Sequence, residues 1–363
     1  FRYDRSTTNN INNSCSPLAL MGALPSIARA KKNQPEYNWK MVTTWPKNFP
    51  GLGTGAQYLA NTINKLSGGR IKVTVYGSGE LVPAFEIFDA VSNGVAELGH
   101  GSAYYWKGKN DTFQFFSTVP FGMTANEMNA WLYKGGGMAL WEEAYKDFNL
   151  VPMAAGNTGV QMGGWFNKEI NSLNDLKGLK MRIPGLGGEV LKRAGGTPVN
   201  LPGGELFTAL KTGTIDATEW VSPYNDLAFG LHKAAKYYYY PGWHEPGTTL
   251  ECFVNKDKYE ELPEDLKSIL LGASKMANID MLCEIISKNN EALEVLKNKH
   301  NVDIRSYPEE VLNELYEISI KVVKELSLSS DFAKEVYNSY ASFQEKTRNW
   351  NDISIKPYLN ANK

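Results

Sequence analysis

The sequence predicts an α/β fold of two lobes with mixed sheets, a hinge between the lobes and long helices near the C-terminus. With 363 residues the chain exceeds the roughly 100–200 residues of a usual domain, so two hydrophobic cores are expected. Strand-like and helix-like segments alternate from about residue 37 to residue 255. No proline lies between Pro263 and Pro308, which leaves room for one long helix there.

The first half of the chain alternates between the two periodicities. Residues 71–76 (IKVTVY) place β-branched side chains at every second position, which is typical of a strand. Phe85, Phe88 and Val91 follow helical spacing. The sequence predicts strands at 39–44, 71–76 and 97–101, and helices at 53–66 and 84–93.

The second half continues the alternation, with strands expected at 151–154, 179–183 and 250–255 and helices at 187–194 and 205–211. Such an order predicts sheets with mainly parallel strands and a ligand beyond their carboxyl ends. The expected division is lobe I from 37–156 and 249–300, lobe II from 157–248, and C-terminal helices from 301–363 that pack on the lobes or form a dimer interface.

The stretch from Pro263 to about His300 is expected to form a single helix, because proline is well tolerated in the first turn. At ~1.5 Å per residue it would be roughly 50 Å long, more than one lobe needs. Such a helix either lies across both lobes or docks on a partner subunit, and the sequence leaves both open. Residues 331–348 predict another helix.

Residues 1–36 look like a secretory leader and a polar linker. Arg2 and Arg5 precede an apolar run of small residues at 16–27, and Ala28-Arg29-Ala30 fits the small-x-small cleavage pattern. The run is shorter than the ~20 residues that span a bilayer. The sequence therefore predicts export to the periplasm.

Charge and motifs exclude several function classes. The 38 basic and 39 acidic residues nearly cancel, which argues against binding to nucleic acid. The sequence contains no Walker motif, HExxH or EF-hand loop, and none of its four histidines lies in a nucleophile-elbow context. PGLGGEVLKRAGG lacks the glycine spacing of a dinucleotide-binding loop. We therefore expect no catalytic activity.

The three cysteines, Cys15, Cys252 and Cys283, have no CxxC spacing and are too scattered for a disulfide framework or a zinc site. Cys252 falls in a strand-like run and Cys283 in a helix-like one. Both are expected to be ordinary buried thiols.

Five loops contain more Gly, Trp, Tyr and amide residues than a fold requires, namely 79–109, 157–165, 176–185, 213–226 and 237–251. Three motifs within them, LKGLKMR, GTIDATEW and YYYYPGW, occur in an order and spacing that resemble the solute-binding subunits of tripartite ATP-independent periplasmic (TRAP) transporters. The resemblance covers about residues 39–358 and is strongest to members that bind 2-oxo acids or lactate together with a metal ion.

The resemblance implies a type II-like periplasmic binding protein fold and a receptor without enzymatic activity. The implied ligand is a small 2-oxo or 2-hydroxy monocarboxylate such as pyruvate or lactate, bound with Na⁺ or Ca²⁺. The implied partners are the membrane subunits of the transporter and a second copy, joined through the long helix as a homodimer. The alternatives are a subunit for another organic acid without a metal, and a periplasmic enzyme that reuses the fold.

Arg182 of LKGLKMRIPG occupies the place of the family's carboxylate-binding arginine. A guanidinium suits this role because its planar fork can donate two parallel hydrogen bonds to a carboxylate and keeps its charge when a cleft closes. Gln161, Glu219 and the backbone carbonyl of Trp220 match the family's metal-binding positions. Glu251 either supplies a second carboxylate or is a hinge or surface residue, and the sequence leaves both open. Oxygen ligands of this kind suit hard cations.

Weaker candidates surround this set. Asn157 could hydrogen-bond the ligand or form a turn before Gly159. The family closes over its solute with tyrosines at the positions of Tyr104 and Tyr105, and Gln161 and Trp220 also count among the implied ligand contacts. Trp106 and Trp243 would add apolar walls or simply pack in the core.

Overall fold

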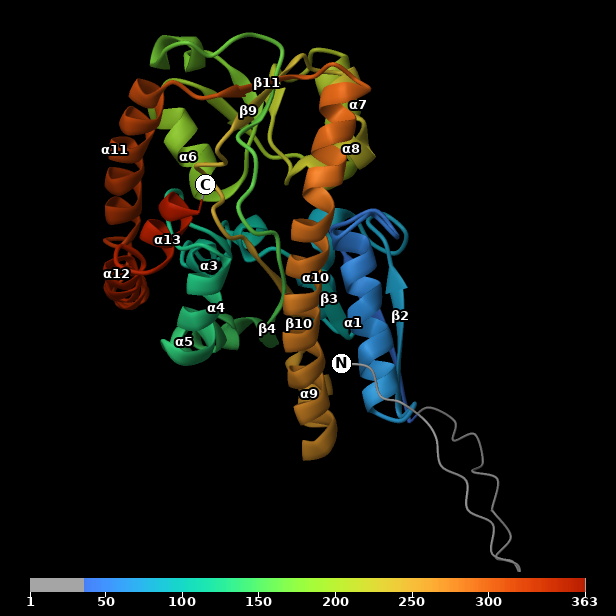
Figure 1. Cartoon of the computed structure of the whole chain (residues 1–363). Coiled ribbons are helices and arrows are strands. Elements are labelled where there is room, and N and C mark those ends of the chain that lie inside the picture. Colours follow the sequence, from blue (N-terminus) through green and yellow to red (C-terminus); the bar gives the residue numbers. More distant parts are fainter. Residues whose placement is uncertain (1–35, 363) are drawn as a thin grey trace, which may run out of the picture. The chain divides into compact units, whose positions relative to one another are not determined.

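The structure is a computed structural model and describes residues 36–362. Two mixed β-sheets form the centres of two lobes, the first in the lower and the second in the upper part of Figure 1. The strand order is β2-β1-β3-β10-β4 in the first sheet and β11-β9-β5-β8-β6-β7 in the second.

The strands are β1 (Tyr37–Thr43), β2 (Ile71–Tyr76), β3 (Leu98–Gly101), β4 (Leu150–Asn157), β5 (Gly164–Phe166), β6 (Lys180–Arg182), β7 (Thr197–Val199), β8 (Ala217–Thr218), β9 (Tyr237–Tyr240), β10 (Thr249–Asn255) and β11 (Asp303–Ser306). The α-helices are α1 (Leu52–Leu66), α2 (Ile87–Ser92), α3 (Phe113–Ser117), α4 (Ala125–Lys134), α5 (Gly137–Tyr145), α6 (Gly185–Arg193), α7 (Leu206–Lys211), α8 (Pro223–Phe229), α9 (Lys256–Glu260), α10 (Glu264–Asn298), α11 (Glu309–Leu326), α12 (Asp331–Asn351) and α13 (Ile355–Ala361).

Both sheets are mixed, because the chain passes between the lobes more than once. Strand β1 pairs in parallel with β2 and β3, whereas β10, which returns from the second lobe, pairs antiparallel with β3 and β4. In the second sheet β6 is parallel to β7 and β8, whereas β5, which enters from the first lobe, runs antiparallel to β8 and β9. Strands β5 and β10 therefore run against both of their neighbours.

Strand β11 was not indicated by the sequence, which led us to expect only helices after residue 300. It pairs in parallel with β9, so residues 303–306 extend the second sheet. Helix α11 then packs against α6 of the second lobe, and α12 packs against α3, α4 and α5 of the first. The C-terminal segment therefore contacts both lobes.

Helix α10 spans 35 residues and was predicted from the absence of proline. It packs along β4 and α1 in the first lobe and against α8 in the second. In Figure 1 it runs vertically through both lobes. Of the two possibilities that the sequence left open, lying across both lobes is confirmed by these contacts.

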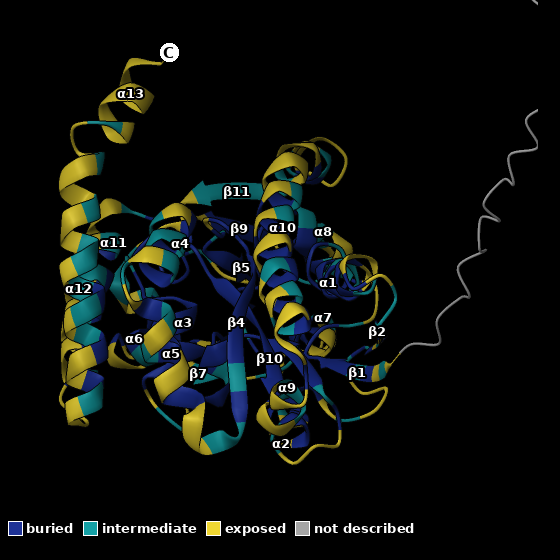
Figure 2. Ribbon diagram, turned by 90° about the horizontal axis from the view of Figure 1, so that it is seen from below, coloured by how far each residue is buried: buried dark blue, intermediate teal, exposed yellow. Residues whose placement is uncertain are grey.

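The cores lie on the sheets, whose strands are mostly buried in Figure 2. Strand β10 is buried at every position, and helices such as α12 expose their outer faces. Cys252 of β10 is buried as expected, but Cys283 of α10 is exposed, so the prediction of a buried thiol was wrong for Cys283. Within residues 36–362 no helix is both long and apolar enough to cross a membrane. The expected leader and Cys15 lie outside the described residues.

Candidate functional site

Two neighbouring parallel strands bring the central charged residues together. Arg182 is the last residue of β6, and its register partner on β8 is Thr218. Glu219 follows Thr218 directly. Arg182 and Glu219 therefore lie at the same edge of the second sheet. This edge is formed by the carboxyl ends of β6 and β8, where α/β folds bind their ligands.

The turn after β8 is held by Asp226 of α8. Its carboxylate accepts hydrogen bonds from the backbone N–H of Val221 (3.0 Å), from Trp165 Nε1 (3.0 Å) and from the hydroxyl of Tyr238 (2.7 Å). Pro223 begins α8 immediately after this turn, a position where proline is favoured. The positions of Glu219 and Trp220 are therefore fixed by buried hydrogen bonds.

Arg182 is 1% exposed and makes four polar contacts. Nε donates to the carbonyl of Leu201 (3.1 Å), Nη1 forms an ion pair with Glu219 Oε1 and lies 3.5 Å from the Glu219 carbonyl, and Nη2 donates to the hydroxyl of Tyr105 (3.3 Å). Burial lowers the pKa of Arg182, but Glu219 together with Tyr105, Tyr104 and Glu245 outweighs the effect of burial, so the pKa is raised. Arg182 is therefore a fixed positive charge inside the protein.

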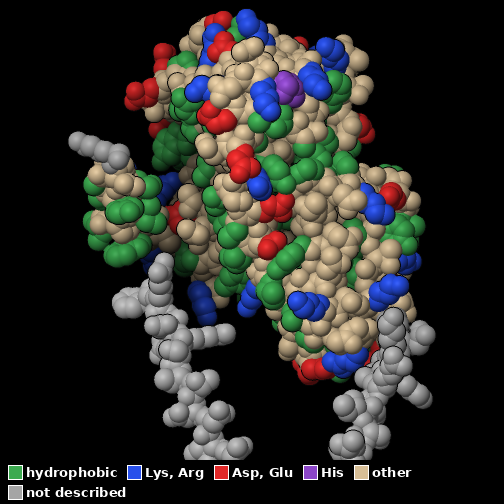
Figure 3. Space-filling view, turned by 45° about the vertical axis from the view of Figure 1, so that its right-hand side comes forward, with side chains coloured by type: hydrophobic (Ala, Val, Ile, Leu, Met, Phe, Trp, Pro, Cys, Tyr) green, Lys and Arg blue, Asp and Glu red, His purple; other side chains and the backbone are tan. Residues whose placement is uncertain are grey.

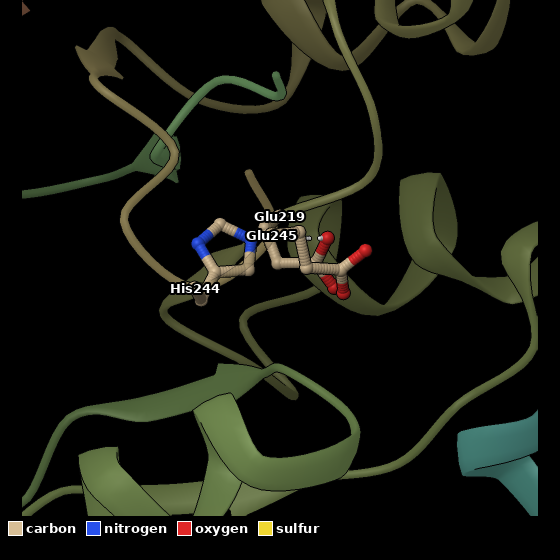
Figure 4. Close-up of side chains that lie close together, drawn as sticks. All are labelled: Glu219, His244 and Glu245. Carbon is tan, nitrogen blue, oxygen red and sulfur yellow. Dashed lines mark ion pairs between the residues drawn. The ribbon is translucent and has the colours of Figure 1, made fainter. Parts of the chain in front are cut away.

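Glu219, the ion-pair partner of this arginine, forms an acidic group with His244 and Glu245, and Figure 4 shows these three side chains. One potential ligand atom from each lies within 4.8 Å of the others, and all three residues are buried. Glu219 Oε2 is 3.5 Å from His244 Nε2. Burial and the charge of Glu219 raise the pKa of Glu245 to about 7. Two carboxylates buried this closely favour a positive partner between them.

Gln161 completes the group and carries an oxygen suited to a cation. Its Nε2 donates to Glu245 Oε2 (2.8 Å), while its Oε1 is buried and has no hydrogen-bond partner within residues 36–362. The carbonyl of Trp220 likewise accepts no hydrogen bond from the described part of the chain. Carboxylate, amide and carbonyl oxygens are what Na⁺ and Ca²⁺ prefer, so the donor set fits either cation.

Glu251, the expected second carboxylate, lies outside this group. It shares a face of β10 with Phe253, whose ring packs on Trp106 and Phe88 in the core of the first lobe. Its two oxygens accept hydrogen bonds from Trp106 Nε1 (2.6 Å) and from the hydroxyl of Tyr145 (2.7 Å). In the structure Glu245 therefore stands where Glu251 was expected.

The buried Glu251 predicts a pH-dependent stability. Burial raises its pKa from 4.5 to about 7, so the folded state binds this proton more tightly than the unfolded state, and stability falls as the pH rises from about 4.5 to about 7. Glu251→Gln removes the buried charge and should raise the free energy of unfolding by about 1–3 kcal/mol at pH 8 and by much less at pH 5. Urea unfolding at both pH values measures this difference.

Glu335→Gln provides the matched control, because Glu335 of α12 is exposed. It should change stability by less than about 0.5 kcal/mol at either pH. An equal gain for Glu251→Gln at pH 5 and pH 8 would contradict the burial of an ionisable carboxylate at this position.

Of the remaining candidates from the sequence, the two tyrosines contact residues of the second lobe, whereas the asparagine and the two tryptophans make other contacts. Tyr105 contacts Arg182, and Tyr104 packs against Gly185, where an added Cβ would come within 3.3 Å of the tyrosine side chain. Asn157 Oδ1 accepts from the backbone N–H of Gly159 (2.9 Å), which is the turn-forming arrangement. Trp106 binds Glu251 in the first lobe, and Trp243 is buried and stacks on Phe121. Trp243 also packs edge-on against His244 of the acidic group, with the two ring centroids 5.4 Å apart.

The sequence did not single out His244 and Glu245, although their loop, 237–251, was recognised as unusual. The signal is the pair His-Glu between Gly242 and Gly247 in a loop rich in glycine and proline. A histidine next to a glutamate in such a loop is a common surface feature, so the pair alone predicts little. Its importance becomes visible only when the fold brings it to Glu219.

Comparison with known proteins gives consistent matches over most of the chain. The family described as bacterial extracellular solute-binding protein, family 7 (DctP), matches residues 41–329. The monocarboxylate 2-oxoacid-binding periplasmic protein of Nostoc sp. is 43% identical over 326 residues, which cover 90% of this chain and 89% of that protein.

Two crystal structures of TRAP periplasmic solute-binding proteins are similar in fold and sequence. The protein from Pseudoalteromonas atlantica, with bound sodium and pyruvate, is 43% identical, with a TM-score of 0.87 and coverage of 90% of this chain and 99% of that chain. The protein from Colwellia psychrerythraea, with bound calcium and pyruvate, is 44% identical, with the same TM-score and coverage. The chain therefore belongs to the DctP family of bacterial extracellular solute-binding proteins.

Proposed function

We propose that this protein is the extracytoplasmic receptor of a TRAP transporter and binds a small 2-oxo monocarboxylate such as pyruvate, or a 2-hydroxy acid such as lactate, together with Na⁺ or Ca²⁺. The observation that carries the proposal is the buried Arg182 beside an acidic group with unpaired oxygen donors. Relatives at 43% and 44% identity contain pyruvate with sodium or calcium.

The site offers complementary partners to both ends of such a ligand. Arg182 would receive the carboxylate through charge-assisted hydrogen bonds. Glu219, Glu245, Gln161 and the Trp220 carbonyl would hold the cation, which supplies positive charge to the oxo or hydroxyl oxygen and to the carboxylate of the ligand. The aromatic ring of Trp220, 5.3 Å from the guanidinium carbon of Arg182, leaves little room for a large side chain on the ligand.

Contacts between the lobes support a role for closure. The turn at 103–106 belongs to the first lobe, yet Tyr105 hydrogen-bonds Arg182 and Lys107 Nζ donates to the carbonyl of Gly185 (3.4 Å) in the second. Gly185 has φ +60° and lies against Tyr104, so the two lobes approach closely at this glycine. A hinge motion that makes and breaks these contacts would signal the loaded state to the membrane subunits.

Calorimetric titration with pyruvate and with lactate tests the proposal. Each acid is titrated in potassium buffer with chelator and again after addition of Na⁺ or Ca²⁺. We expect saturable binding of at least one acid in the presence of a cation, and no binding of acetate at similar concentration, because acetate lacks the oxo or hydroxyl oxygen next to the carboxylate. Binding that ignores the cation would favour a metal-free organic acid receptor, and chemical change of recovered ligand in mass spectrometry would favour an enzyme.

We also propose that the receptor is a homodimer joined through α10. Met276, Ile279, Cys283 and Ile286 follow one another at spacings of three and four residues and form one exposed stripe, here called the α10 stripe. The opposite side of α10, with residues such as Ala277, is buried against the lobes. A helix that is apolar on both sides is usually buried on both sides.

The position of the α10 stripe suits a second copy. Hydrophobic side chains lie at the surface across the middle of the face shown in Figure 3. Ile279 is 50% exposed and Ile286 is 62% exposed, so these apolar side chains are in contact with water in a single chain. Burial of the stripe against the same stripe of a second copy, related by two-fold symmetry, would remove this contact.

Export to the periplasm completes the proposal. The leader pattern at 1–30, with its apolar run and Ala28-Arg29-Ala30, is consistent with a protein that acts outside the cytoplasmic membrane. The family to which the chain belongs is extracellular. Membership in this family and the leader pattern therefore point to the same compartment.

A further inference from the structure

The guanidinium of Arg182 is occupied on both of its binding edges. A carboxylate binds arginine in the strongest way when it meets two parallel N–H groups, either Nη1 with Nη2 or Nε with Nη2. In the structure Nη1 is paired with Glu219 and Nε donates to the Leu201 carbonyl (3.1 Å). A ligand carboxylate therefore cannot receive two parallel bonds until one of these partners leaves.

Glu219 is the partner that can leave. Leu201 O is a backbone atom, whereas Glu219 Oε1 ends a side chain whose other oxygen, Oε2, already faces His244 and Glu245. A buried carboxylate that loses its only strong cationic partner is costly, so Glu219 should release Arg182 only when another positive charge replaces it. The acidic group is where such a charge would bind.

We propose that Glu219 couples the binding of the cation to the binding of the carboxylate ligand. Without a cation, Glu219 pairs with Arg182 and blocks the ligand's place. With a cation, Glu219 turns to it, and Nη1 of Arg182 becomes free to receive the ligand. This regulation rests on the proposed function of the site, and it requires each partner to strengthen binding of the other by the same factor.

Glu219 differs in this respect from Glu245, which also belongs to the acidic group. Glu245 is held by Gln161 Nε2 (2.8 Å) and by the hydroxyl of Thr248 (2.5 Å), and it makes no ion pair with Arg182. Both glutamates can bind a cation, but only Glu219 competes with the ligand for the guanidinium. The two substitutions Glu219→Gln and Glu245→Gln therefore separate coupling from simple loss of a cation ligand.

The first experiment is a calorimetric titration of pyruvate with chelator and with Ca²⁺. In the wild-type protein Ca²⁺ should strengthen pyruvate binding at least about tenfold. With chelator, Glu219→Gln should bind pyruvate at least about fivefold more tightly than the wild type, because Arg182 is no longer blocked, and the effect of Ca²⁺ should shrink to less than about threefold. With chelator, the gain in pyruvate affinity of Glu219→Gln must be at least about threefold larger than that of Glu245→Gln, because the loss of one negative charge favours anion binding in both variants. Equal gains, or none, overturn the proposal.

Glu189→Gln is the matched surface control. Glu189 lies on α6 in the same lobe and forms its ion pair with Arg193, away from the acidic group. This variant should show the same pyruvate affinity and the same Ca²⁺ effect as the wild type. A similar gain with chelator in this variant would count against a specific role of Glu219.

The second experiment uses Ca²⁺ alone, so it stays informative even if pyruvate is the wrong ligand. In the wild-type background, Arg182→Met should strengthen Ca²⁺ binding at least about fivefold, because Glu219 loses the partner that competes with the cation. In the Glu219→Gln background, where this competition is absent, the same substitution should strengthen Ca²⁺ binding less than about twofold. An equal factor in both backgrounds would show a simple charge effect and overturn the coupling. Failure of the wild type to bind Ca²⁺ or Na⁺ would overturn it as well. If the wild type binds a cation but not pyruvate, only the proposed ligand is overturned.

Discussion

Arg182→Ala should weaken the binding of pyruvate, measured with saturating cation, by about 2–5 kcal/mol, which is roughly 30-fold to several thousandfold in Kd. The closed site would otherwise bury the ligand carboxylate without its cationic partner. Arg182→Lys should lose a similar amount, because an ammonium group is a point charge and cannot replace the planar fork. Isothermal titration calorimetry provides the dissociation constants.

Two controls guard this prediction against a trivial loss of folding. Arg193→Lys changes an exposed arginine of α6 that pairs with Glu189 and Glu325, and it should leave Kd within about twofold. Because Arg182→Ala leaves Glu219 buried without its partner, thermal unfolding is measured as well. The double variant Arg182→Ala/Glu219→Gln should recover stability without recovering full affinity. Near-normal pyruvate affinity in the folded Arg182→Ala protein would refute the role of this arginine.

The fold could be predicted where a segment's own pattern determines its structure. Strand β2 coincides with the predicted residues 71–76, because β-branched residues at alternate positions favour a strand regardless of context. Helix α10 was predicted because a long proline-free stretch of good helix formers can propagate without a break. For these two elements the local sequence is sufficient to predict the secondary structure.

Strand β11 could not be predicted, because its four residues, Asp-Ile-Arg-Ser, carry no alternating apolar pattern. They form a strand because the edge of β9 offers unpaired backbone groups to them. The exposure of Cys283 has a similar origin. Its place in an apolar helix predicted burial, but the lobes cover only the opposite side of α10. Both features depend on tertiary neighbours that the local sequence does not specify.

The candidate site was foreseen in part. The motif resemblance selected Arg182 and Glu219, and the parallel pairing of β6 with β8 explains why they meet. Glu251 was misplaced because the direction of a side chain on β10 depends on register. The pairing of β10 with β4 shifts between Leu250 and Glu251, and such an irregularity cannot be recognised from sequence alone. Glu245 was missed because its loop has no periodic structure that would indicate a direction.

Dimerisation through the α10 stripe leads to the prediction with the second large effect. Ile279→Glu places a carboxylate in the middle of the stripe, between Met276 and Cys283. If this stripe packs on its own copy, each dimer must bury two such charges close to the symmetry axis. We expect the dimer dissociation constant to rise at least about a hundredfold, while the isolated chain, in which Ile279 is 50% exposed, stays folded.

Sedimentation velocity over a range of protein concentrations measures this change, and Ile320→Glu on α11 is a closely matched control. Ile320 is 49% exposed, so the same substitution at nearly the same exposure tests whether a new surface charge is sufficient to separate the copies. Ile320→Glu should remain dimeric, and Ile279→Glu should be monomeric at micromolar concentration yet still bind pyruvate. A wild-type protein that is monomeric at high concentration, or an Ile279→Glu variant that remains dimeric, would show that α10 does not join two receptors.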